Sequence, residues 1–196
     1  LSAFIPGKDT KRDDYVSRPR FLAITEFGPR SLIYHEGSRY RINQVILPMR
    51  EGEAQITTVA VKLCASCGYR HEDNRMEACE NCGSPLLNSQ NFQIDKLLRL
   101  QNVVAKRVDQ INCDEEERLR LGFNIRACLR FTSRADGPSK QVAELMQGER
   151  CLATLSYGDA AEIWRINLGM RKQTDGEPIG FLLDPASGYW VKSSDE

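Results

Sequence analysis

The sequences CASCG at residues 64–68 and CENCG at residues 79–83 decide the fold. Each contains a C-x-x-C pair, and the eleven residues 68–78 separate the two pairs. Two residues between paired cysteines let both sulfur atoms point to one side of a tight turn, so each pair supplies two corners of a tetrahedron. The glycine after each second cysteine favours the same turn, because a positive φ there aims backbone N–H groups at the thiolates. The spacing therefore predicts one metal site with the ligands Cys64, Cys67, Cys79 and Cys82.

Four thiolates predict a structural Zn²⁺, because they leave no coordination position open for water or substrate. Binding would supply apparent folding free energy on the order of 10 kcal/mol, enough to decide whether a loop-rich segment folds. His71 is an alternative ligand that the four cysteines make unnecessary. A second interpretation, that some of these cysteines are only buried thiols, does not account for the paired spacing and the glycines.

The remaining cysteines do not have metal-ligand spacing. The chain has seven cysteines, and an odd number without a signal peptide predicts reduced thiols and a cytoplasmic location. Cys128 falls on the polar side of a predicted strand, and Cys113 and Cys151 lie near the ends of predicted elements. For all three we expect ordinary packing and not reactivity.

Length and composition indicate a globular chain. With 196 residues, 41% of them hydrophobic, the chain can form one large domain or two small ones. No apolar run approaches the roughly 20 residues that span a bilayer, and the opening LSAFIP is too short for a signal-peptide core. We therefore expect no membrane partner. Because the chain begins with Leu1 and not Met, a piece cut from a longer protein is one interpretation that we keep open.

Most of the predicted elements are strands. Residues 21–24, after a proline, read as a strand, and residues 31–34 and 40–42 read as a hairpin. Residues 56–63 form a strand that leads into the first cysteine pair, with Thr57, Val59, Val61 and Leu63 on one face. Further strands are expected at 125–131, 152–157 and 162–168, and a last hairpin at 181–183 and 189–191. Residues 94–111 fit a helix or a strand, whereas 114–121 predict a helix with acidic residues in its first turn.

These elements predict an α+β fold with β-rich antiparallel sheets, a four-cysteine zinc-ribbon-like insertion and few helices. We expect a β-rich part at residues 1–60, the zinc-binding insertion at 61–90 and an α+β part at 91–196. The first and last parts are expected to form one compact domain.

The sequence carries no motif of the common enzyme classes. It has no phosphate-binding G-x-x-x-x-G-K-[ST], no G-x-S-x-G and no H-E-x-x-H. Its two histidines are His35 and His71, and His35 beside Glu36 reads as a solvated turn in preference to an acid–base pair. The acidic run 115–117 cannot converge on one ligand, because adjacent helical residues point about 100° apart. We predict no catalytic residues in this chain.

Nucleic-acid contacts are a further hypothesis. The formal charge is zero, with 27 basic and 27 acidic residues, but residues 1–50 carry nine basic residues against five acidic ones. Surface ion pairing with acidic neighbours is the equal alternative for several of the basic residues. Trp164 and Trp190 are expected to be core anchors and not base-stacking platforms. The candidate phosphate-binding residues are Arg18, Arg20, Lys106, Arg107, Arg126 and Arg130.

Residues 17–29, SRPRFLAITEFGP, followed by IYHEG at 33–37, resemble the C-terminal accessory region of large bacterial DEAD/DEAH-box helicases. The cysteine quartet, DEEER at 114–118 with Gly122, and Tyr157-Gly158 followed by Ala161 and IWRIN at 163–167 extend the resemblance over most of the chain. It is similar to the zinc-binding domain of unknown function that ends mitomycin-repair-type helicases and recurs in DISARM phage-defence proteins.

The resemblance implies a module of a superfamily 2, ATP-dependent DNA-translocating enzyme in DNA repair or phage defence. The motor itself would lie elsewhere in the parent chain or complex, because no Walker A lysine or DEAD/DEAH box occurs here. We expect an accessory domain that guides or separates DNA strands; the alternative is a protein-interaction scaffold that docks a helicase core or defence partner. An autonomous zinc hydrolase or deaminase would need an open coordination site, which four cysteines do not leave.

Overall fold

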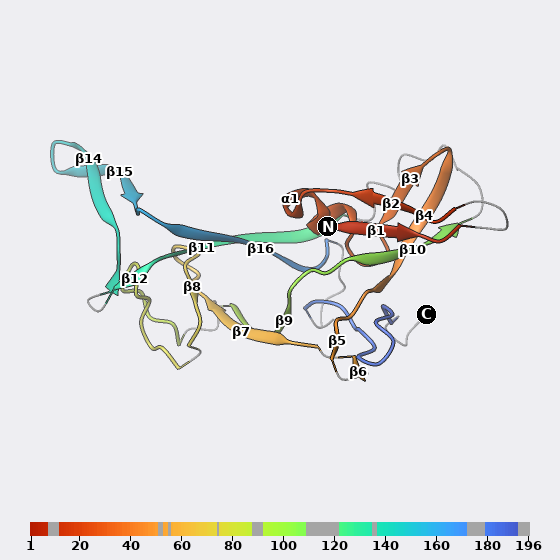
Figure 1. The fold of residues 1–196 in the computed structure, drawn as a ribbon. Helices are drawn as coiled ribbons and strands as arrows, with labels where there is room; N and C mark the ends of the chain where they lie inside the picture. The colour runs from red at the N-terminus through yellow and green to blue at the C-terminus, as the bar shows by residue number, and fades with distance from the viewer. Residues whose placement is uncertain are drawn as a thin grey trace. The chain divides into compact units, whose positions relative to one another are not determined.

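The computed structural model describes residues 1–7, 12–50, 53–54, 56–73, 75–87, 92–108, 122–134, 137–171 and 179–191. Within these ranges the chain is mostly β-strand in several small sheets, with α1 as its one helix (Figure 1). The predicted β-rich α+β fold is confirmed. The chain forms two compact units: unit 1 comprises residues 1–57, 98–126 and 165–196, and unit 2 comprises residues 58–97 and 127–164. The α1 helix is far too short to cross a membrane, and no longer helix occurs in the described ranges.

Unit 1 is built on a five-stranded sheet in the order β2-β1-β10-β4-β3 (Figure 1). The β1 and β10 strands are parallel, and the other neighbours are antiparallel. One face is buried against α1, with Ala3, Ile42, Val103 and Ala105 almost fully buried. The bounds are β1 Ser2–Ile5, β2 Asp14–Ser17, β3 Leu32–His35, β4 Ser38–Val45 and β10 Val103–Val108.

The two edge strands of this sheet are joined by side chains. His35 Nε2, at the end of β3, lies 2.5 Å from Asp14 Oδ2, at the start of β2. The contact links the first and last strands of the sheet order. The hydrogen bond from His35 also lowers the pKa of Asp14. The predicted β3–β4 hairpin is confirmed, and its turn has positive φ at both central residues, Glu36 and Gly37, as a type I′ turn requires.

The predicted strand at residues 21–24 is wrong: α1 runs from Arg20 to Glu26. The carbonyl of Pro19 accepts the backbone N–H of Ala23 at 2.9 Å, and the carbonyl of Ala23 accepts that of Phe27 at 2.9 Å. Ala23 and Phe27 are both fully buried, whereas Phe21 is 67% exposed. The buried positions are four apart, as in a helix, and not two apart as in a strand.

Short strands complete unit 1 around the sheet. The β5 strand (Met49–Arg50) pairs with β6 (Glu53–Ala54). The predicted C-terminal hairpin is confirmed by a bridge between Leu183 and Trp190. Trp190 packs against the core, as predicted for this anchor. Gly188 is required there, because a Cβ would lie 2.3 Å from the Val45 carbonyl oxygen.

Unit 2 carries the cysteine pairs beside a three-stranded sheet in the order β8-β7-β9. The strands are β7 Thr58–Leu63, β8 Arg70–His71 and β9 Phe92–Leu98. It also contains the β12–β13 pair (Ser133–Arg134 and Gly137–Pro138) and the hairpin of β14 (Gln141–Gln147) and β15 (Arg150–Tyr157). The β11 strand (Phe123–Phe131) pairs with β16 (Ala161–Met170), and the division between the two units passes through both strands.

Several sequence predictions need correction or fall elsewhere. Val59 is 44% exposed, so β7 does not bury the whole predicted face. Cys128 is 3% exposed and lies on the buried side of β11, not on its polar side. Cys151 is exposed on β15, so the packing predicted for it is wrong. Where described, residues 94–111 form strand, as β9 and β10, while the predicted helix at 114–121 and Cys113 lie outside the described residues.

Candidate metal centre

Two turns of equal geometry hold the four cysteines. The Gly68 N–H donates to the Cys64 carbonyl at 2.9 Å, and the Gly83 N–H donates to the Cys79 carbonyl at 2.8 Å. Gly68 has φ +71° and Gly83 has φ +73°, and a Cβ on either would meet no atom within 4 Å. Glycine is therefore needed at both positions for its backbone conformation and not for space. This is the role that the sequence predicted for the two glycines.

The four sulfur atoms converge on one point. Cys64 Sγ lies 3.7 Å from Cys82 Sγ, and Cys67 Sγ lies 3.6 Å from Cys79 Sγ. All four sulfurs lie within 4.8 Å of one another. These separations are far longer than the roughly 2.05 Å of a disulfide bond. They match the edge of about 3.8 Å expected for a tetrahedron of thiolates around an ion at about 2.3 Å. The quartet thus has the donor set and spacing of a metal site.

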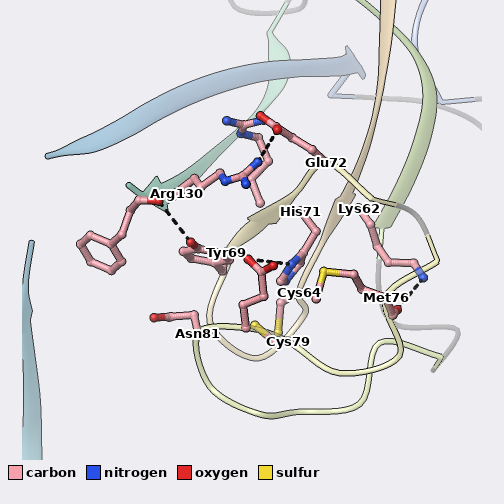
Figure 2. Close-up of polar contacts among 12 residues, drawn as sticks. Lys62, Cys64, Tyr69, His71, Glu72, Met76, Cys79, Asn81 and Arg130 are labelled. Carbon is pink, nitrogen blue, oxygen red and sulfur yellow. Dashed lines mark hydrogen bonds and ion pairs between the residues drawn. The ribbon is translucent and has the colours of Figure 1, made fainter. Parts of the chain in front are cut away.

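A small apolar core supports the centre from one side. Cys64, Tyr69, Cys79, Leu86 and Phe131 are buried together. The Tyr69 hydroxyl donates to the Phe131 carbonyl at 3.4 Å (Figure 2), and a parallel bridge joins Tyr69 to Leu129 of β11. The first cysteine turn is therefore tied to a strand about 60 positions later in the chain. Cys82 is the exposed member of the quartet.

Polar groups around the sulfurs orient the ligands. The Asn81 side-chain amide donates to Cys67 Sγ at 3.5 Å. Lys140 Nζ donates to both the backbone carbonyl and Oδ1 of Asn81, each at 2.6 Å. Because Lys140 occupies the amide oxygen, the amide nitrogen is left to face the sulfur. Such outer contacts orient metal ligands and stabilise their charged form.

The metal-free thiols differ in acidity. Burial raises the pKa of Cys67 and of Cys79. Burial also opposes ionisation of Cys82, but the contact with Ser84, whose Oγ lies 3.3 Å away, and those with Cys67 and Cys79 outweigh it and lower its pKa to about 6. Cys82 is therefore the thiol of these three that ionises most readily before an ion binds.

His71 lies beside the centre without joining it. It is 1% exposed, its ring centroid is 5.2 Å from that of Tyr69, and Nδ1 is 3.9 Å from Glu80 Oε2 (Figure 2). Among the described residues, neither ring nitrogen has a hydrogen-bond partner. The cysteine quartet does not include it, in agreement with the expectation that His71 is not needed as a ligand.

His71 predicts an acid sensitivity of unit 2. Burial lowers its pKa from 6.5, so the folded chain keeps the ring neutral where the unfolded chain binds a proton. The contribution of His71 to the free energy of unfolding is therefore fully present above pH 6.5, and it is lost as the pH drops from 6.5 to the lower pKa of the folded state. We expect the thermal unfolding midpoint to fall over this interval, and a His71→Phe variant to show a smaller slope. Midpoints measured at several pH values, with metal content determined at each, check this, and an equal slope in the variant would contradict it.

The sequence did not identify a buried arginine in unit 2. Arg70 is 1% exposed, and its guanidinium donates to Glu72 at 3.0 Å and to Glu162 at 2.7 Å. Its Cζ lies 3.8 Å from the ring centroid of Trp164, so this tryptophan supports the fold and its ring is covered on one side. Glu72 is a local signal for an ion pair, but Glu162 is 92 positions away from Arg70, beyond any local pattern.

The predicted phosphate-binding residues have different surroundings. Arg18 pairs with Glu26 at 2.7 Å, and Arg130 pairs with Glu72 at 2.6 Å (Figure 2). Arg20 donates to the Leu100 carbonyl at 3.2 Å. Lys106 and Arg107 are exposed on β10, while Arg126 is half-buried on β11. Successive side chains of a strand point to opposite faces of the sheet, so Lys106, opposite Arg41, and Arg107, opposite Tyr40, do not form one cationic site.

Comparison with protein-family models, with curated proteins and with solved structures finds no match to this chain.

Proposed function

We propose that the cysteine quartet binds one structural zinc ion. The observation that carries this proposal is the convergence of the four sulfur atoms, with Cys64 Sγ 3.7 Å from Cys82 Sγ and Cys67 Sγ 3.6 Å from Cys79 Sγ. Four thiolates fill the tetrahedral coordination of zinc and leave no coordination position open for a substrate. Iron also binds four thiolates in a tetrahedron, and the two ions are told apart by colour, because zinc has no visible absorption. With zinc, the site would carry a net charge of about −2, of which the Lys140 ammonium, hydrogen-bonded to Asn81, would offset one unit. The role of such an ion is to fold unit 2 and not to catalyse a reaction.

We propose that the chain is an accessory domain of a superfamily 2 ATP-dependent DNA helicase in the cytoplasm. The support is the cysteine quartet together with the helicase-type sequence blocks described above. The domain would assist DNA binding or strand guidance in repair or phage defence. ATP hydrolysis is assigned to motor domains in the same parent chain or complex, because this sequence has no motor motif.

A specific observation favours a second candidate, a scaffold that docks the helicase core or a defence partner. In the β14–β15 hairpin, Ala143 lies opposite Leu155 and Leu145 lies opposite Ala153, so these apolar residues share one face. Leu155 is 69% exposed and Leu145 is 58% exposed. A two-stranded hairpin with an uncovered apolar face is marginal in water and gains stability from a covering surface.

The first test measures metal and DNA binding on the whole chain. Mass spectrometry should find one zinc per chain, and fluorescence anisotropy should show binding to forked DNA that weakens from low to moderate salt. One zinc without DNA binding would favour the scaffold. In that case, purified motor domains should bind the chain and lose binding when Leu155→Glu places a charge on the hairpin. Absence of a metal ion would overturn the proposed zinc site.

A further inference from the structure

The sheet of unit 1 has two very different faces. Residues that alternate with the buried core positions point to the other side, which we call the outer sheet face; the residues that define it are Phe4, Tyr15, Tyr34, Arg41 and Lys106. The register places Tyr15 opposite Phe4 and Lys106 opposite Arg41. These side chains come from all five strands, so the face is fixed by the rigid sheet and not by a loop.

Two aromatic rings of this face lie side by side on β1 and β2, and a third lies on β3, at the other end of the strand order. Tyr15 is 62% exposed, and its ring centroid is 5.2 Å from that of Phe4, with the planes tilted by 46°. Tyr34, on β3, is 37% exposed. The core of unit 1 does not need these rings, because Ile5, Val16 and Ile33 fill the inward positions of the same strands. Exposed rings on a rigid sheet are the platforms on which unpaired bases stack.

Two cations lie beside the rings. Arg41 and Lys106 are both exposed and directly opposite each other, an arrangement of like charges that is unfavourable by itself. In the part of the chain that the structure describes, neither forms an ion pair, and the outward positions of the five strands carry no Asp or Glu. The strand carboxylate, Asp14, is opposite the buried Ile5 and is held by His35. The outer sheet face is therefore positively charged, and a bound anion would reduce the repulsion between Arg41 and Lys106.

The rings and the cations are close enough to act on the same ligand. Phe4 is paired with Val104, and Lys106 is two residues further along β10. Two residues of strand span roughly 7 Å, and neighbouring strands are roughly 5 Å apart. A polymer that carries flat rings and negative charges at short, regular intervals satisfies both groups. Duplex DNA offers its charges but keeps its bases stacked inside, so it cannot use the rings.

We propose that the outer sheet face binds single-stranded DNA, with bases stacked on Tyr15 and Phe4 and phosphates held by Arg41 and Lys106. The proposal rests on the proposed DNA-handling function and gives that function a site and a strand preference. Lys106 is one of the six basic residues that the sequence predicted to bind phosphate, and the other five do not belong to the proposed site. Arg41, Tyr15 and Phe4 become DNA-binding residues only through the sheet register.

The test is anisotropy of a fluorescent oligothymidine titrated with the zinc-loaded chain. Tyr15→Ala should weaken binding about tenfold or more, since stacking on one ring is worth about 1–3 kcal/mol per base. The double variant Arg41→Gln/Lys106→Gln should reduce the slope of log affinity against log salt by about 1.4, at about 0.7 for each phosphate contact. The matched controls are Tyr157→Ala and Arg75→Gln/Lys96→Gln, which change exposed residues of unit 2 and should bind as the unmodified chain does. Metal content and thermal unfolding verify that each variant is folded.

The outcomes separate this inference from the function on which it rests. Unchanged affinity of the Tyr15 and Arg41/Lys106 variants, in a chain that still binds forked DNA, would overturn the outer sheet face and leave the helicase-associated function intact. Failure of the unmodified chain to bind any DNA would overturn both. Tighter binding of oligouridine than of oligothymidine would overturn the assignment to DNA.

Discussion

A Cys79→Ser variant is expected to lose its metal ion and to unfold the two cysteine turns of unit 2. Cys79 is 3% exposed, and its sulfur lies 3.6 Å from that of Cys67. Removing one of four thiolates breaks the tetrahedron, and serine is a poor ligand for the same ion. Structural zinc contributes apparent folding free energy on the order of 10 kcal/mol, as much as the whole stability of a typical domain. Loss of the ion should therefore be enough by itself to unfold these turns.

Metal content and hydrogen exchange together measure this result. The variant should contain no stoichiometric zinc and should lose amide protection in residues 64–86, while β1, β4 and β10 of unit 1 keep theirs, because the core of unit 1 contains none of the ligands. Cys151→Ser is the matched control, since Cys151 is exposed and outside the quartet. Cys128→Ser should also retain the ion, although this buried site will lose some stability. Equal zinc in the Cys79 and Cys151 variants would refute the ligand assignment.

The metal ligands could be identified from sequence because they are encoded locally. Each pair occupies one turn, and the glycines that the turns need stand directly after the cysteines, so spacing alone specifies the geometry. The outer contacts could not be identified in this way. Lys140 reaches Asn81 across 59 positions, and no periodic pattern relates a β14-flanking lysine to a cysteine turn.

Strands could be predicted where apolar and polar residues alternate between turn residues. The errors at residues 21–24 and in β11 have different physical causes. At residues 21–24 the apolar run suits a strand, but the burial of both Ala23 and Phe27 against the sheet selects a short helix after Pro19. In β11 the predicted alternation breaks because the strand passes from unit 1 to unit 2 after Arg126. Phe123, in unit 1, and Cys128, in unit 2, are both buried although they are five positions apart, so the strand does not bury a single alternating face.

The second large effect is expected at Arg70. An Arg70→Ala variant should lower the free energy of unfolding of unit 2 by about 3 kcal/mol. The carboxylates of Glu72 and Glu162 are 62% and 65% exposed, so they regain water when the arginine is lost. The cost therefore comes from the cavity at a side chain that is 1% exposed and from the lost contact with Trp164. Arg70→Met fills most of that volume and should cost only about 1 kcal/mol.

Urea unfolding of the zinc-loaded chain, followed by the fluorescence of Trp164 in a Trp190→Phe background, measures this difference. Arg75→Ala is the control, because the Arg75 side chain is 96% exposed and its nearest carboxylate oxygen on Asp73 is 3.8 Å away. Such surface pairs contribute about 0.5 kcal/mol or less. If Arg70→Ala proved as mild as Arg75→Ala, the buried guanidinium would not be a packing element. If Arg70→Met proved as costly as Arg70→Ala, the charge and not the volume would hold β8 in place, and the stability of unit 2 would then depend on the exposed glutamates.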